Sequence, residues 1–413
     1  MSKKKWLTAG IDVGTTKICC CIAEIEGDGI EVLGSGWCPS KGLRKGVVVN
    51  LSETIQSIKT SLETAESEAG TVVESAYVSV GGRFIRSANT RAETEVRGKN
   101  GRVAPEDIVR ALDIVRDFEL PSDYEILHAL PQDFILDDQE GVVDPLGMSG
   151  HRLAVNLHLV LNATAVVQNI VNAINRAGVV VNAVVMQQLA SAEAVLTADE
   201  KELGSVLVDI GGGTTDISVY NQGKIWHSEV VPLGGTLITK DIAIGLRAPL
   251  EEAEKLKIRM GTVFPSAVPE EEVIEIGEMG TGRTQSFPRR ELCRIIEARC
   301  EEILQSTDHV LRRAGVEPDL NCGVVFTGGG ALMQGLVEKA ENILGMPVRL
   351  GYPTHFQGKA RESFGPAYST GLGLLRYAMA QQQNELARIA RSHLPARPRA
   401  TREWLKNLFF ERV

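Results

Sequence analysis

Apolar residues follow two periods along the chain, and the changes of period mark the expected elements. Between residues 9 and 25 two apolar strands flank a glycine–threonine turn, whereas residues 51–68 carry apolar side chains at helical spacing. Further strands are expected over 76–81, 179–186 and 204–221, and further helices over 165–177, 187–200 and 368–379. Strands alternating with helices predict an α/β fold.

Two stretches interrupt this alternation and predict inserted units. Residues 82–161 combine a helix near 105–118 with long strand-like runs, so we expect a small separate domain within the first half. Residues 238–299 are charged and rich in helical patterns, which favours a second insert. Beyond residue 380 the chain becomes polar and bears Arg and Pro, typical of a helix running out into a flexible linker.

Composition narrows the possible functions. A chain of 413 residues with 43% hydrophobic content can bury a substantial core and form several domains. The net charge of −9 argues against nucleic-acid binding. The seven cysteines, three of them consecutive at 19–21, lack metal-ligand spacing, and we assign them no functional role. Neither a secretory signal nor an apolar run of about twenty residues is present, so we expect a cytosolic chain.

Two glycine–threonine turns carry the main candidate chemistry. IDVGTTK and VDIGGGTTD each end an apolar strand at an Asp and then turn through glycines, whose N–H groups can face phosphate oxygens. The predicted phosphate-binding residues are Asp12, Gly14, Thr15, Thr16, Lys17, Asp209, Gly211, Gly212, Gly213 and Thr214. A carboxylate beside phosphates calls for a cation between them, so Asp12 and Asp209 predict Mg²⁺ held through water. One such turn is often only a hairpin turn, but two copies predict a nucleotide clamped between two domains.

A third glycine cluster, in VVFTGGGALMQGL, follows a buried strand. Gly328, Gly329 and Gly330 would allow close packing against ribose and adenine, although an ordinary strand-to-helix turn has the same appearance. Glu254 and Lys257 lie three residues apart on one helix and are further candidates on the adenosine side; a solvated charge pair is the alternative.

Together these motifs resemble those of the superfamily that contains actin, sugar kinases and heat-shock chaperones. The resemblance implies an actin-like fold of two related α/β domains around an ATP cleft, each with a small inserted or appended subdomain. MQQLASAEAVL and SFGPAYSTGLGLLRYA resemble the two connecting helices of that fold.

The whole chain resembles the FtsA family of bacterial cell-division proteins. The resemblance rests on CPSKGLRKGVVVNL, HALPQDFILDDQEGVVDPLGMSG and LTADEKELGSVLVDIGGGTTDISVY, and on the linker and tail. It implies an ATP-binding, polymerising adaptor that tethers FtsZ filaments to the cytoplasmic face of the inner membrane at the division site. It also implies that the adaptor helps to recruit later cell-division membrane proteins, with the first insert used in protomer contacts and the second receiving the C-terminal peptide of FtsZ.

The implied domain layout has nine parts. These are the first actin-like domain (1–82), its inserted subdomain (83–162), the return with a connecting helix (163–202), the second domain (203–237), its insert (238–300), the adenosine motif (301–362), the second connecting helix (363–380), the linker (381–400) and an amphipathic helix (401–413).

The last segment, TREWLKNLFFERV, predicts a membrane-targeting helix. A helical wheel places Trp404, Leu405, Leu408 and Phe409 on one side and Lys406 on the other, with Phe410 and Arg412 as exceptions. From Leu386 onward there are seven Lys or Arg residues and only two Glu residues, and this positive excess favours binding to an anionic bilayer. Docking on the protein's own core or on a partner is the alternative.

Arg289, Arg290 and Arg294, beside apolar side chains in the second insert, suit an acidic peptide such as the FtsZ tail, although a solvated helix has the same pattern. Four functions are compatible with the superfamily resemblance: the membrane adaptor, a small-molecule kinase of the same superfamily, a chaperone ATPase and a pilus-assembly relative. A kinase needs a positioned base and a substrate pocket, and outside the nucleotide loops no sequence motif indicates either of them.

Gln187 or Gln188 could orient a water, so we expect slow ATP hydrolysis at most, with no other catalytic residue assigned.

Overall fold

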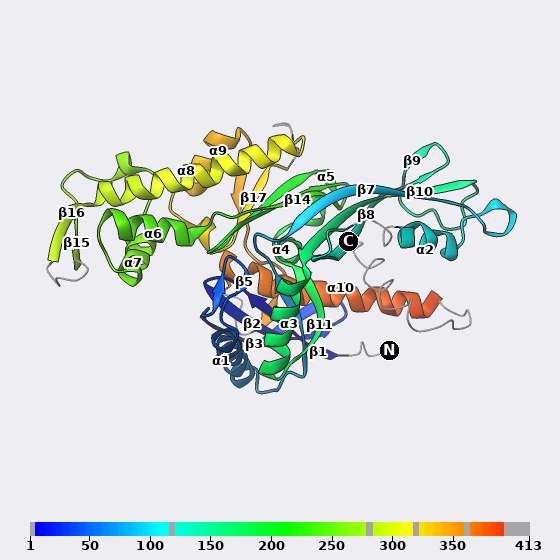
Figure 1. The fold of residues 1–413 in the computed structure, drawn as a ribbon, viewed down its shortest axis with the longest axis horizontal. Helices are drawn as coiled ribbons and strands as arrows, with labels where there is room; N and C mark the ends of the chain where they lie inside the picture. The colour runs from blue at the N-terminus through cyan, green and yellow to red at the C-terminus, as the bar shows by residue number, and fades with distance from the viewer. Residues whose placement is uncertain (1–4, 115–119, 278–283, 317–321, 359–363, 392–413) are drawn as a thin grey trace.

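The computed structural model describes residues 5–114, 120–277, 284–316, 322–358 and 364–391. Two α/β halves meet near the centre of the molecule, and a separate arm extends from each side (Figure 1). Within these ranges no helix combines the length and apolar character needed to cross a membrane.

The first half is built on a six-stranded sheet with the order β11-β6-β1-β2-β3-β19. Its strands are β1 (Trp6–Val13), β2 (Lys17–Glu26), β3 (Gly29–Pro39), β6 (Ser75–Val80), β11 (Val180–Met186) and β19 (Gln357–Gly358). β1 and β2 form an antiparallel hairpin, and β6 runs parallel to β1. Helices α1 (Leu51–Ala69) and α3 (Thr164–Ala177) cover one face, beside the short hairpin β4 (Leu43–Arg44) and β5 (Val47–Val48).

The second half repeats this plan. Its sheet has the order β14-β13-β12-β17-β18, formed by β12 (Ser205–Ile210), β13 (Thr215–Asn221), β14 (Lys224–Val231), β17 (Val324–Thr327) and β18 (Val348–Leu350). β12 and β13 form the hairpin, and β17 runs parallel to β12. α9 (Leu336–Leu344) packs on β18. The predicted pair of related α/β domains is confirmed.

Two connecting helices lie between the halves. α4 (Gln187–Val195) and α10 (Ser369–Arg391) pack so closely that a Cβ on Gly373 would lie 1.7 Å from the carbonyl oxygen of Ala190. The helix expected over 187–200 is in fact two helices, because Thr197 caps a new helix, α5 (Ala198–Leu203), in a capping box with Glu200. α10 continues past the boundary expected at residue 380, through a run of good helix formers, to Arg391.

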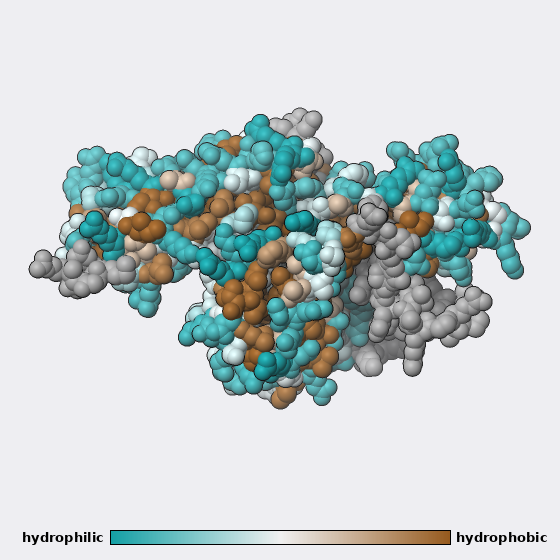
Figure 2. Space-filling view, in the orientation of Figure 1, coloured by the Kyte–Doolittle hydropathy of each residue, from teal (hydrophilic) through white to brown (hydrophobic). Residues whose placement is uncertain are grey.

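The first insert is a four-stranded sheet with the order β7-β10-β8-β9 and one helix. The elements are β7 (Arg86–Glu95), α2 (Pro105–Asp113), β8 (Tyr124–Leu136), β9 (Gln139–Val142) and β10 (Arg152–Ala163). It has a small core of its own that includes Leu112, Leu153 and Leu157. The surface of both arms is mainly hydrophilic, whereas hydrophobic side chains gather on the visible face of the first half (Figure 2).

The second arm contains α6 (Gly235–Gly245), α7 (Leu250–Met260), α8 (Arg289–Arg313) and a hairpin of β15 (Val273–Gly277) and β16 (Thr284–Pro288). The sequence pattern predicted a helix-rich unit here but not this hairpin, whose strands are short and half exposed. α8 crosses the boundary expected at residue 300 and carries its buried face, including Ile296, Cys300 and Leu304, from the arm into the core of the second half.

Candidate functional site

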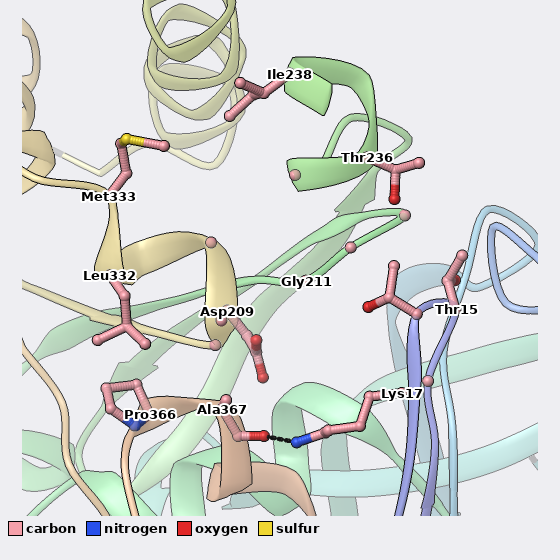
Figure 3. A pocket seen from close by; sticks show the side chains of 18 of the residues that line it. Thr15, Lys17, Asp209, Gly211, Thr236, Ile238, Leu332, Met333, Pro366 and Ala367 are labelled. Carbon is pink, nitrogen blue, oxygen red and sulfur yellow. Dashed lines mark hydrogen bonds between the residues drawn. The ribbon is translucent and has the colours of Figure 1, made fainter. Parts of the chain in front are cut away.

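A cavity of about 640 Å³ lies between the halves. It is lined by the turns of both hairpins, by the glycine cluster after β17, by α7 and by the start of α10 (Figure 3). All of the residues predicted for phosphate and adenosine line this one cavity: Asp12, Gly14, Thr15, Thr16, Lys17, Asp209, Gly211, Gly212, Gly213, Thr214, Glu254, Lys257, Gly328, Gly329 and Gly330. Segments more than three hundred residues apart therefore share one site.

Asp12 lies at the end of β1 and is buried, with 7% of its surface exposed. Its Oδ1 accepts hydrogen bonds from Ser79 Oγ at 2.8 Å and from Gln187 Nε2 at 3.2 Å. Burial raises the pKa of the Asp12 carboxyl, against the opposing effect of the Lys17 ammonium. The carboxylate is thus fixed in position and would be stabilised by a cation in the cavity.

Lys17 begins β2 and reaches across the cavity to the short helical turn (Pro366–Tyr368) that precedes α10. Its ammonium donates to the carbonyl oxygen of Ala367 (Figure 3) and lies 4.5 Å from the centre of the Tyr368 ring. The ammonium is therefore held at the junction of the halves, where it can meet an anionic ligand.

Asp209 occupies the equivalent place at the end of β12. Its Oδ2 accepts a hydrogen bond from Ser191 Oγ of α4 at 2.6 Å, and Ser191 in turn contacts Thr370 of α10 at 2.9 Å. Burial raises the pKa of Asp209 to about 6, and the nearby Asp12 contributes in the same direction. Both connecting helices therefore take part in holding this carboxylate.

Asp216 is a third buried carboxyl in the cavity, and sequence reasoning assigned it no role. Strand pairing places it opposite Asp209 in the β12–β13 hairpin, and this register was the signal that could have revealed it. Its Oδ2 accepts from Thr214 Oγ1 at 2.9 Å, while its Oδ1 has no partner among the described residues. Burial, followed by the charge of Asp209, raises the pKa of Asp216 to about 8.

Glycines allow the two turns to approach each other. A Cβ on Gly212 would lie 2.3 Å from Thr16 Cγ2, and one on Gly213 would lie 2.6 Å from Thr15 Oγ1. Gly328 has φ +84°, and a Cβ there would lie 2.3 Å from Asp209 Oδ1. No side chain fits at these places, so the cavity keeps a wall of exposed backbone groups.

The opposite side of the cavity is partly apolar. Lys257 Nζ contacts Glu254 Oε2 at 2.6 Å and Thr239 Oγ1 at 3.0 Å. Only 12% of the Lys257 side chain is exposed, so Lys257 is not half of a fully solvated pair. The side chains of Ile238, Ile258, Leu332 and Met333 complete this wall. A wall of this composition can accept a flat heteroaromatic ring.

Other lining residues were not predicted. Trp37, Gly235, Thr236, Arg259, Gln334, Pro366, Ala367 and Thr370 belong to this group. Gly235 and Thr236 carry a local signal, because LGGT is a glycine–threonine turn like the others, whereas the rest reach the cavity only through tertiary packing. Of the two glutamines proposed for water orientation, Gln187 lines the cavity and Gln188 is fully buried in the core.

The donor set of the cavity fits Mg²⁺ held mainly through water and ligand oxygens. Asp12 and Asp209 are buried carboxylates from opposite halves, and Asp216 presents an unpartnered oxygen. Within the described ranges, however, no three His, Cys, Asp or Glu side chains form a direct metal cluster. A cation here would need oxygen ligands from water or phosphate, as the sequence predicts.

The remaining predicted residues lie elsewhere. Arg289 makes a two-bond ion pair with Glu272, with both distances 2.9 Å, and Arg290 pairs with Glu270. Arg290 and Arg294 line a shallow hollow with Pro265, Ser266 and Glu297. The predicted membrane residues Trp404, Leu405, Lys406, Leu408 and Phe409 lie outside the described residues.

Two related α/β halves around a cavity lined by paired glycine–threonine turns define an actin-like protein. A family model described as "Cell division protein FtsA" matches residues 206–373, and one described as "SHS2 domain inserted in FTSA" matches residues 82–161. The chain belongs to the FtsA family of cell-division proteins. It is 42% identical to FtsA of Pseudomonas aeruginosa over 92% of this chain and 91% of that protein, and 34% identical to FtsA of Escherichia coli over 93% of each.

Solved structures confirm the actin-like fold. The "PilM-PilN type IV pilus biogenesis complex" matches with a TM-score of 0.65 and 16% identity, covering 89% of this chain and 97% of that one. MreB5 of Spiroplasma citri bound to ADP matches with a TM-score of 0.54 and 13% identity, covering 92% and 98%. At these identities the likeness concerns the fold alone.

Proposed function

We propose that this cell-division protein binds ATP with Mg²⁺ in the central cavity, polymerises, and tethers FtsZ filaments to the cytoplasmic face of the inner membrane at the division site. In this role it helps to recruit later membrane proteins of the septum. The observation that carries the proposal is the meeting of three glycine-rich turns from both halves around one cavity with Asp12, Asp209 and Lys17.

In this proposal the chain contributes binding and orientation. The N–H groups of Gly212 and Gly213 and the hydroxyls of Thr15 and Thr16 face the phosphates, and Lys17 supplies a positive charge. The N–H of Gly211 instead closes the turn by donating to the carbonyl oxygen of Thr214 at 2.9 Å. Bound Mg²⁺ would neutralise phosphate charge and orient the polyphosphate, with Asp12 and Asp209 holding its water ligands.

Slow hydrolysis at most is expected from this arrangement. Gln187 is the residue proposed to orient an attacking water, because it reaches the cavity from the N-terminus of α4. Its side-chain nitrogen already donates to Asp12, so positioning a water would compete with that bond.

The peptide-binding surface is proposed to centre on Arg294 and Arg290. These two side chains line the hollow at the N-terminal end of α8, where an acidic peptide would meet positive charge. Arg289 does not line this hollow and is paired with Glu272. Arg290 lines the hollow but is paired with Glu270, so the proposal depends chiefly on Arg294.

Membrane attachment is proposed for residues 401–413. The basic, aromatic-bearing end of an acidic chain supports attachment to anionic lipid, and a short amphipathic helix folds mainly when its apolar face meets the bilayer. Polymerisation would strengthen attachment, because several tails on one filament bind at high effective concentration.

Co-sedimentation with anionic phospholipid vesicles and FtsZ tests the adaptor function. We expect the full chain with ATP to carry FtsZ into the vesicle pellet. Deletion of residues 401–413 should remove both proteins from the pellet, whereas Arg294→Glu should remove FtsZ alone. Retention of the deletion variant on vesicles would refute attachment through the tail, and retention of FtsZ by Arg294→Glu would exclude that residue from the peptide site.

A further inference from the structure

The polypeptide chain joins the first insert to the first half of the molecule, but side chains of the insert make hydrogen bonds to the second half. The chain enters it from β6 and leaves it into α3, both in the first half. Its strands β7 and β8 nevertheless lie beside β14, the edge strand of the second half (Figure 1). Any rotation of the halves relative to each other must therefore move the insert with one half and strain its bonds to the other.

Side chains of the insert donate hydrogen bonds to backbone carbonyl oxygens of β14. Ser87 Oγ donates to the carbonyl oxygen of Ser228 at 2.5 Å, and Asn89 Nδ2 donates to that of Trp226 at 3.0 Å. Gln132 Nε2 donates to the carbonyl of Ile225 at 3.0 Å and to that of Trp226 at 3.3 Å. Side-chain donors thus take the place of a neighbouring strand along this edge.

His158 of β10 is fully buried at the centre of these contacts. Its Nδ1 lies 2.6 Å from Asn89 Oδ1 and its Nε2 lies 2.8 Å from Ser228 Oγ. In one tautomer, Nδ1–H of His158 donates to Asn89 Oδ1 and Nε2 accepts from the Ser228 hydroxyl. Asn89 Nδ2 then donates to the carbonyl oxygen of Trp226, so the polar side chains of His158, Asn89 and Ser228 all have hydrogen-bond partners. Burial, together with His227, lowers the pKa of His158 to about 3, so the ring is neutral at physiological pH.

β14 leads directly from this contact into the candidate nucleotide cavity. It ends at Val231, and the residues that follow include Gly235 and Thr236 of the cavity wall. The N–H of Gly235 donates to the carbonyl of Gly211 at 2.9 Å, and that of Thr236 donates to the carbonyl of Gly212 at 2.8 Å. One continuous segment therefore bonds to the second phosphate turn at one end and to the insert at the other.

We propose that these contacts form a polar latch that couples nucleotide occupancy to the position of the insert. The latch consists of Ser87, Asn89, Gln132 and His158 on the insert and Ile225, Trp226 and Ser228 on β14. Nucleotide that orders Gly211 and Gly212 holds the end of β14 and strengthens the latch. By reciprocity, an intact latch tightens nucleotide binding. This inference rests on the nucleotide binding proposed above and adds the regulation of that site.

Hydrogen–deuterium exchange and calorimetry on the full chain test the coupling. The test variant is Asn89→Ala combined with Gln132→Ala, which removes three donor contacts to β14. Asn156→Ala is the matched control, because Asn156 also lies in the insert sheet but donates to Asp133 within the insert, at 2.8 Å. Ser228→Ala, which removes the hydroxyl partner of His158 from the other side, serves as a second variant if the double variant does not fold.

In the wild type and in Asn156→Ala we expect ATP to slow amide exchange in both β14 and β7. In the latch variants the exchange of β7 should no longer respond to ATP, and ATP affinity should fall roughly fivefold or more. Unchanged ATP affinity together with an unchanged response of β7 in both latch variants would overturn the coupling. Failure of the wild type to bind ATP would instead refute the proposed nucleotide site, and with it the basis of the latch's role.

Discussion

Asp209→Asn is expected to abolish ATP binding while making the nucleotide-free protein more stable at pH 8. Burial raises the pKa of Asp209 from its ordinary 3.8 to about 6, so the folded protein holds this proton more firmly than the unfolded chain does. The free energy of unfolding therefore falls as pH rises from about 4 to about 6. Above pH 6 the buried carboxyl is charged, and the whole of this destabilisation applies. Asn has no such charge, so the gain at pH 8 should be on the order of 1–3 kcal/mol.

Urea unfolding at pH 5 and pH 8, together with ATP calorimetry, measures both effects. Asp138→Asn is the matched control, because the Asp138 side chain is 99% exposed and lies in the insert. It should change neither quantity. An Asp209→Asn variant that binds ATP as the wild type does, or that is no more stable at pH 8, would show that Asp209 does not serve as the buried charge of a cation–phosphate site.

Gly328→Ala is expected to cause the largest combined loss of stability and ATP binding. The residue has φ +84° and ψ 165°, a region that essentially only glycine occupies. An added Cβ would lie 2.3 Å from Asp209 Oδ1 and 2.6 Å from the carbonyl oxygen of Ile210. We expect the free energy of unfolding to fall by roughly 2–4 kcal/mol and ATP binding to be lost, because Asp209 must move.

Gly329→Ala is the adjacent control for the stability measurement. Its nearest neighbour would be Ala367 Cβ at 3.8 Å, an ordinary contact, and its φ is not positive. Thermal or urea unfolding should place this variant within about 1 kcal/mol of the wild type. Equal stability losses at the two glycines would contradict the argument from the Gly328 conformation.

The parts of the site that are local in sequence were predictable. Each phosphate turn is a short run of glycine and threonine after an apolar strand, so its residues and its place at a strand end follow from the motif itself. The duplication of the pattern also implied that both turns face one cleft, although it did not predict the direct contact of Gly212 with Thr16. The binding roles of these residues stay predictions.

The parts that depend on long-range packing were not predictable. Asp216 does not belong to this group, because the local β12–β13 hairpin places it opposite Asp209 and that register could have revealed it. The bond from Lys17 to Ala367 joins residues 350 positions apart. His158 lies within an apolar strand, and nothing local to it indicates that its partner is Ser228 of the other half.

Calorimetric titration of the full-length chain with ATP, in the presence and in the absence of Mg²⁺, tests most directly whether the turns of the two halves grip one nucleotide. We expect saturable binding of one ATP per chain that weakens markedly when Mg²⁺ is removed, because three buried carboxyls then face the phosphates without a cation. No detectable binding of ATP or ADP under either condition would contradict a nucleotide site between the halves.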